Sequence, residues 1–135
     1  MDMKEINRKV IEQFRAGGEV DGMHRERLLL LTTTGARTGA PRITPMMFHR
    51  LDDRLLVMAS NNGAPTAPDW YRNLVANQDV TVEIGDERYA AVANPLSGEE
   101  LVGAWADITA ANPFFLDHEK RAGRTIPVVA LDRTA

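Results

Sequence analysis

Arg37 and Arg42 lie on either side of a tight turn in which Gly35 and Gly39 allow positive φ angles and close backbone approach. Two guanidinium groups that converge around such a turn can bind a phosphate or a carboxylate. The turn follows the apolar run Leu28–Leu31, which is typical of a strand buried on both faces. The segment therefore predicts an anion site at a strand end. From these residues alone, a surface hairpin with two solvated arginines stays an open alternative.

A second candidate site begins where Pro68 and Asp69 indicate the start of a helix. Trp70 and Asn73 are three residues apart, so on a helix they share a face beside the preceding loop. An aromatic plane next to an amide can hold a flat ligand. The alternative is that Trp70 belongs to the core and Asn73 to the solvated helix surface.

Several kinds of catalytic site are not indicated. None of the three histidines has a partner at metal-ligand spacing, so no metal site is expected. Ser60 is not part of a Gly-x-Ser-x-Gly elbow, and the chain contains no cysteine that could act as a nucleophile. Redox chemistry in this chain would therefore need a bound cofactor.

Length and charge narrow the class of protein. A chain of 135 residues with 44% hydrophobic content predicts one domain over residues 1–135. A net charge of -3 disfavours a general nucleic-acid binder. The longest apolar run is far shorter than the ~20 residues of a membrane span, so we expect a cytoplasmic protein.

Hydrophobic periodicity predicts an amphipathic helix within residues 1–17, ended by Gly17 and Gly18. Packing on the core is the ordinary role of such a helix. Weak association with a membrane surface is the alternative, because the polar face mixes basic and acidic residues.

The rest of the chain predicts mainly β structure with flanking helices (α+β). Six strands are expected, at about residues 28–31, 43–50, 55–59, 80–84, 88–93 and 126–131. The first three would form an antiparallel meander, with a turn at Asp52-Asp53. Helices are expected from residue 67 to about 77 and after Ser97, where Ser97 and Glu100 fit a capping box. Adjacent hairpins favour an antiparallel sheet closed into a small barrel.

The motifs at residues 31–45, Ala59-Ser60 and 69–74 are ordered and spaced as in one family. They resemble the deazaflavin-dependent nitroreductase family of actinobacteria. The resemblance implies a split β-barrel, like those that bind FMN, holding the 8-hydroxy-5-deazaflavin coenzyme F(420). It also implies hydride transfer at the C5 carbon of that coenzyme.

Site roles follow from the resemblance by position. Arg37, Thr38 and Arg42 would hold the phosphate and acidic glutamyl tail of the coenzyme. Thr44 and Pro45 would lie along one side of the deazaflavin ring, with Met58, Ala59 and Ser60 along the other, and Trp70 and Asn73 would close on the tail. The remaining cofactor contacts by position are Ala36, Asn61 and Asp69.

Two departures from the family pattern affect these roles. Family members often have a lysine where this chain has Asn61, so one cationic contact with the tail is missing. The tyrosines that line the substrate pocket of the nitroimidazole-activating member correspond to Asn112, Phe115 and His118. Phe115 could stack on a planar substrate and His118 could supply a proton, or the segment could simply face the core.

The predicted activity is a reductase that passes hydride from reduced F(420) to a small planar quinone, enone or nitroaromatic compound. Ser60 and His118 are the candidate proton donors. Two alternatives are a module that binds or stores the deazaflavin without catalysis, and a barrel that binds FMN. By analogy with FMN-binding split barrels, a homodimer is also expected.

Overall fold

The computed structural model describes residues 3–20 and 25–134, which form seven strands, four α-helices and two 3₁₀ helices. The strands are β1 (Leu28–Thr34), β2 (Pro41–Met47), β3 (His49–Leu51), β4 (Arg54–Met58), β5 (Asp79–Ile84), β6 (Glu87–Pro95) and β7 (Val128–Arg133). The α-helices are α1 (Met3–Arg15), α2 (Asp69–Ala76), α3 (Gly98–Ala111) and α4 (Phe114–Ala122). The 3₁₀ helices are η1 (Arg25–Arg27) and η2 (Asn61–Gly63).

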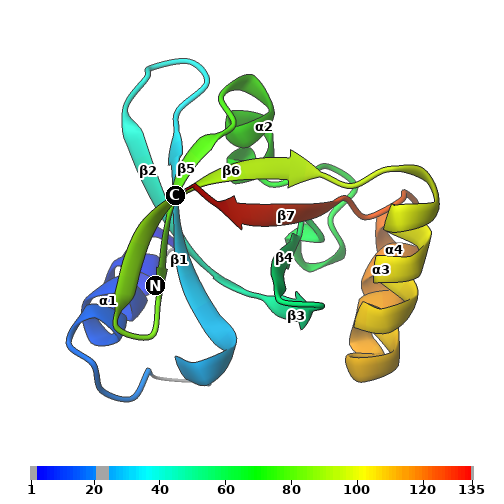
Figure 1. The fold of residues 1–135 in the computed structure, drawn as a ribbon, viewed down its shortest axis with the longest axis horizontal. Helices are drawn as coiled ribbons and strands as arrows, with labels where there is room; N and C mark the ends of the chain where they lie inside the picture. Colours follow the sequence, from blue (N-terminus) through cyan, green and yellow to red (C-terminus); the bar gives the residue numbers. More distant parts are fainter. Residues whose placement is uncertain (1–2, 21–24, 135) are drawn as a thin grey trace.

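The strands form one antiparallel sheet in the order β2-β1-β5-β6-β7-β4-β3. Strands β2 and β3 stand at opposite ends of this order, although Phe48 alone separates them in the chain. The sheet must therefore curl until its two edges approach each other, as Figure 1 shows. The prediction of a mainly β fold with flanking helices and an antiparallel sheet is confirmed.

The expected number of six strands is wrong, because the strand predicted at residues 43–50 is interrupted at Phe48. Strand β2 pairs with β1 as far as Met47, which lies opposite Leu28, the first residue of β1. The partner strand ends there, and the Phe48 N–H donates instead to the Arg27 carbonyl at 3.2 Å. The predicted meander is split at the same point. Residues 41–47 pair with β1 and residues 49–51 pair with β4, both antiparallel as expected, but β2 and β3 lie at opposite edges of the sheet.

Strand β1 separates two hydrophobic clusters, which confirms that its apolar run is buried on both faces. Leu29 and Leu31 belong to the inner cluster on the concave side of the sheet. Leu28 and Leu30 pack on the other side with Val10, Phe14 and Val20 from the α1 segment. Successive side chains of a strand point to opposite faces, so a run of four leucines supplies both clusters. Helix α1 therefore covers the outer side of the sheet at this end.

Helices α3 and α4 cover the outer side of the sheet at the end formed by β4 and β7 (Figure 1). Helix α3 begins at Gly98, directly after Ser97, as expected. The capping box is wrong, however, because no hydrogen bond from the Ser97 side chain caps the helix among the described residues. The Glu100 carboxylate instead accepts from Arg54 at 3.2 Å.

Arg54 links two strands and one helix through its guanidinium group. It donates to Asp132 of β7 at 3.1 and 2.9 Å and to Glu100 of α3. Asn94 of β6 donates to the same Asp132 carboxylate at 2.8 Å. The hydrogen bonds from Arg54 lower the pKa of Asp132, and burial opposes them only in part.

We predict that Asp132→Asn lowers the free energy of unfolding by about 1 kcal/mol at pH 7, because solvent screening limits a half-exposed ion pair. The folded pKa of Asp132 lies below its unfolded value of about 3.9, so its stabilising effect is present above that pH. This effect is lost as the pH falls through the lower, folded value.

Urea unfolding of the wild type and Asp132→Asn at pH 7 and pH 3 measures this contribution. The difference between the two proteins should shrink at pH 3. The control is Asp79→Asn, at an exposed position at the start of β5. An equal difference at both pH values would contradict the prediction.

Candidate functional site

The turn between β1 and β2 is shaped by two glycines, as expected. The Gly35 N–H donates to the Ala40 carbonyl and the Gly39 N–H to the Gly35 carbonyl, both at 2.8 Å. Gly39 has a φ of 71°, and a Cβ atom at Gly35 would lie 2.9 Å from Thr38 Oγ1 and 3.1 Å from the Ala40 carbonyl oxygen. The turn therefore requires glycine at both positions, for its backbone conformation at one and for space at the other.

Asn73 of α2 attaches this turn to the rest of the protein. Its Oδ1 accepts from the Ala36 N–H at 3.0 Å, and its Nδ2 donates to Thr33 Oγ1 at 3.3 Å. Both Asn73 and Thr33 are buried. The side-chain amide of Asn73 thus holds the turn through both its donor and its acceptor, and the structure brings together two of the residues predicted for the site, Asn73 and Ala36.

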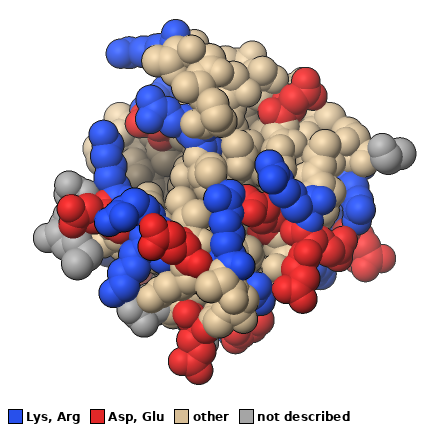
Figure 2. Space-filling view, turned by 90° about the vertical axis from the view of Figure 1, so that its left-hand side faces the viewer, with Lys and Arg blue, Asp and Glu red and all other residues tan. Residues whose placement is uncertain are grey.

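Arg37 lies in the turn and Arg42 on β2 directly after it, and both are exposed. Neither guanidinium group makes a hydrogen bond or ion pair with any of the described residues. By contrast, Arg15, Arg54 and Arg133 each bind a carboxylate. Figure 2 shows basic side chains on the uppermost part of the face it presents, where the β1–β2 turn lies in Figure 1. The two arginines therefore leave two cationic donors available to an anion.

A second group of predicted site residues lies in the loop after β4. Ser60 is buried, and Asn61 has a φ of 49° and donates through Nδ2 to the Thr66 carbonyl at 3.1 Å. Gly63 has a φ of 84°, and a Cβ atom there would lie 3.4 Å from the Cα of His118. The loop therefore rests directly on α4, which places the Ser60 segment beside the helix that carries His118.

The α4 residues form an aromatic cluster. Phe115 is 4% exposed and packs with Met58 in the outer cluster, whereas Phe114 is 42% exposed with its ring centroid 4.3 Å from that of Phe115. The His118 ring meets both phenylalanines edge-on, and its Nδ1 is buried without a hydrogen-bond partner in the described part of the chain. Asn112 ends α3 and donates to the Ile108 carbonyl at 3.4 Å.

The remaining predicted residues connect these two groups. Trp70 of α2 and Ala59 after β4 share the inner hydrophobic cluster. Thr44 and Pro45 are half-buried on β2, and β2 approaches β4 across the curled sheet. Asp69 is exposed and forms an ion pair with Arg72. The structure thus brings the turn together with α2, and the Ser60 loop together with α4, while Trp70 and Ala59 lie in the inner cluster and Met58 and Phe115 in the outer one.

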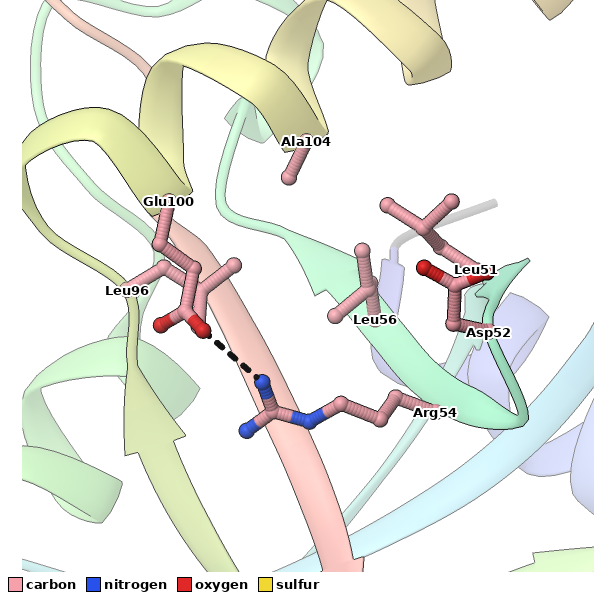
Figure 3. A pocket seen from close by; sticks show the side chains of 7 residues that line it. All are labelled: Leu51, Asp52, Arg54, Leu56, Leu96, Glu100 and Ala104. Carbon is pink, nitrogen blue, oxygen red and sulfur yellow. Dashed lines mark hydrogen bonds and ion pairs between the residues drawn. The ribbon is translucent and has the colours of Figure 1, made fainter.

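Two pockets lie elsewhere. Figure 3 shows one of about 140 Å³ between the β3–β4 hairpin and α3, with the Arg54–Glu100 pair on one side and Leu51 and Asp52 on the other. A second of about 430 Å³ is lined mostly by charged residues of β3, β4, β6 and β7 and of the β3–β4 turn. None of the predicted site residues is among the described residues that line these two pockets.

Residues 3–20 and 25–134 contain no cluster of three or more side chains suited to a metal ion. His49 instead contacts Asp107 of α3 through Nε2 at 2.6 Å, and His24 lies outside the described residues. None of the described helices is both long and apolar enough to span a membrane.

Sequence reasoning missed Arg124, which follows the glycine that ends α4. Its guanidinium group donates to four backbone carbonyls of the loop after β4, at 3.1 to 3.3 Å. The only local signal is an arginine between Gly123 and the last strand, and a basic residue in a connecting turn is ordinary. Contacts 58 to 65 residues away in the chain cannot be inferred from such a position.

A sequence profile for proteins described as F420H(2)-dependent quinone reductase matches residues 5–133. The chain belongs to this family. An F420H(2)-dependent quinone reductase of Mycobacterium tuberculosis is 38% identical over 108 residues, covering 78% of this chain and 72% of that protein. The resemblance to deazaflavin-dependent reductases is confirmed, and reduced F(420) is the coenzyme of the family.

Solved structures agree with this membership. The F420-H2 dependent reductase FDR-A has a TM-score of 0.72 at 33% identity, covering 82% of this chain and 100% of that one. A chain described as a domain-swapped dimer has a TM-score of 0.74 at 33% identity, covering 93% and 96%. The heme storage protein HutZ of Vibrio cholerae, at 17% identity and a TM-score of 0.63, shares the fold alone.

We predict that Asn73→Ala in this family member lowers the free energy of unfolding by about 1–3 kcal/mol. The change leaves the buried Thr33 hydroxyl and the Ala36 N–H without their partner. Hydrogen exchange at Ala36 should also accelerate.

The matched control is Val75→Ala, an exposed position on the same helix. Urea unfolding and amide exchange measure both effects. If Asn73→Ala matched the control in stability and in exchange at the turn, Asn73 would not anchor it.

Proposed function

We propose that this protein reduces quinones, and related planar electrophiles such as enones or nitroaromatic compounds, with reduced F(420) as the hydride donor. Family membership and one structural observation support the proposal. That observation is the exposed pair Arg37 and Arg42, unpaired with any described residue, on a turn held rigidly by Asn73. The donors fit the group chemically, because the coenzyme ends in a phosphate and an acidic tail and no described carboxylate neutralises these two arginines.

In this proposal the arginines, with Thr38, bind the anionic tail. Thr44 and Pro45 on β2 and the Met58–Ser60 segment after β4 bound the ring site, since β2 and β4 approach each other across the sheet. Trp70 supports this site from the inner cluster. Asn73 acts through the turn that it anchors. Ala36, Asn61 and Asp69 complete the cofactor contacts that the resemblance assigns by position.

When bound, the reduced coenzyme supplies the hydride, so the chain needs no nucleophile of its own. Its residues orient the two reactants, exclude water and deliver a proton. Ser60 and His118 are the proposed proton sources, because the loop that carries Ser60 rests on α4 beside His118. Phe115 and Asn112 would shape the acceptor side, with the exposed Phe114 ring stacked beside Phe115.

We also propose that the curled sheet is a split β-barrel of the FMN-binding type and that residues 1–135 act as a single deazaflavin-binding domain. The approach of the sheet edges at Phe48 supports the barrel. The similarity to a chain described as a domain-swapped dimer supports a homodimer. A cytoplasmic location and weak membrane-surface association through α1 stay predictions.

Mixing the purified protein with reduced F(420) and menadione tests the activity directly. We expect the oxidation of the coenzyme, followed by its absorbance, to be much faster than in the absence of protein. Tight F(420) binding without turnover across several quinones, enones and nitroaromatics would instead indicate a storage module. Much tighter binding of FMN than of F(420) in a fluorescence titration would overturn the cofactor assignment.

We predict that Arg37→Ala combined with Arg42→Ala weakens F(420) binding by about 10- to 100-fold, since each charge-assisted contact contributes about 1 kcal/mol at an exposed site. The loss should diminish at high salt, because ions screen exposed charges.

Arg88→Ala removes an exposed arginine that lies on β6, outside the proposed site, and should leave affinity unchanged. Fluorescence titration of the three proteins decides the result. Equal affinity for the double variant and the wild type would remove the arginine pair from the cofactor site.

A further inference from the structure

We propose that Arg124 is a positioning residue that fixes the loop of residues 59–66 for cofactor binding. Its guanidinium group reaches this loop from the turn between α4 and β7. The inference rests on the proposed function, because it assigns importance to the loop through Ser60. Arg124 itself acts through the backbone of the loop.

The guanidinium group of Arg124 alone contacts four backbone carbonyls of this loop. Nη2 of Arg124 shares its two N–H groups among three carbonyls, those of Ala59 at 3.2 Å, Ser60 at 3.3 Å and Thr66 at 3.1 Å. Its Nε donates to the Ala64 carbonyl at 3.3 Å. The four acceptors include both ends of the loop, so one rigid group sets the distance between them.

The loop has few other means of holding its shape. Within it, the N–H groups of Gly63 and Ala64 donate to the carbonyls of Ser60 and Asn61 at 2.9 and 3.0 Å, which closes the short η2 turn. The Asn61 side chain adds one bond across the loop, from Nδ2 to the Thr66 carbonyl at 3.1 Å. These three bonds lie inside the loop and do not attach it to α4 or β7. Asn61 has a positive φ of 49°, which costs a residue other than glycine some free energy, so external contacts help to hold this conformation.

The same connecting segment also holds the start of the loop. The Ala59 N–H donates to the Pro127 carbonyl at 2.9 Å, three residues after Arg124. On its other side the loop lies against α4, where a Cβ atom at Gly63 would meet the Arg121 side chain at 3.2 Å. The loop thus contacts α4 on one side and the segment between α4 and β7 on the other. Arg124, in that segment, supplies four of the hydrogen bonds to the loop backbone.

Removal of Arg124 would leave these four carbonyls without their charged donor while α4 and β7 keep their own packing in the outer cluster. The loop would then sample other conformations, and a ligand that needs Ser60 in one place would have to order it first. Lysine keeps the charge but is a point donor on a flexible stem, so it cannot reproduce the four-carbonyl contact.

The test compares the wild type with Arg124→Ala, Arg124→Lys and, as a matched control, Lys120→Ala, which removes an exposed cation of α4. Three measurements are made: amide hydrogen exchange of residues 60–66 in the cofactor-free protein, F(420) affinity by fluorescence, and kcat and KM for menadione. We expect Arg124→Ala to accelerate exchange in the loop and to weaken F(420) binding, each by about tenfold or more. Both effects should be smaller in Arg124→Lys than in Arg124→Ala, and Lys120→Ala should match the wild type.

A separate comparison distinguishes this role from that of the arginine pair. The double variant of Arg37 and Arg42 should lose affinity with unchanged exchange in residues 60–66, whereas Arg124→Ala should change both. If Arg124→Ala does not fold, Arg124→Lys decides, because it should loosen the loop while the protein still unfolds cooperatively.

Unchanged loop exchange, or a loosened loop with wild-type affinity and kcat, would overturn the inference while F(420) binding by the wild type stands. Failure of the wild type to bind F(420) would overturn the proposed function first. In that case the proposed role of Arg124 in cofactor binding would be overturned as well. The exchange data would then show only that Arg124 stabilises the conformation of the loop.

Discussion

Burial of strand β1 on both faces is the constraint on which the other features depend. Leu29 and Leu31 face the inner cluster, while Leu28 and Leu30 face α1, so the strand cannot slide by one residue without exchanging its two faces. This fixed register determines where β1 ends and therefore where the Gly35–Ala40 turn projects. It also determines where the pairing with β2 stops, which sends the chain across to the opposite edge of the sheet.

The site is built on polar side chains that hold backbone from a distance. Asn73 ties the turn to α2, and Arg124 ties the loop after β4 to the segment following α4. In both cases a side chain supplies the hydrogen bonds that an irregular backbone segment lacks. For a reaction whose chemistry resides in the coenzyme, rigid placement of two such segments is the main contribution that the protein can make.

Features governed by neighbouring residues could be predicted from the sequence, and features governed by distant contacts could not. The leucine run, the glycine turn and the helix after Pro68 follow from local periodicity and backbone preference. The break at Phe48 depends on where β1 begins, and the unused cap at Ser97 accompanies the engagement of Glu100 by Arg54. Both require knowledge of the fold. The motifs could locate the candidate site along the chain, but neither the amide bonds of Asn73 nor the reach of Arg124 has a local signature.

The distribution of arginines explains how a chain with a net charge of -3 can present a site for an anion. An arginine paired with a carboxylate contributes little electric field beyond its own ion pair. Arg37 and Arg42 have no such partner among the described residues, and they lie in and directly after one turn. The Asn61 side chain is neutral, and its Nδ2 donates to the Thr66 carbonyl. It therefore helps to hold the loop without adding charge. In the proposed site, recognition of an acidic tail would then depend mainly on the two arginines of the turn.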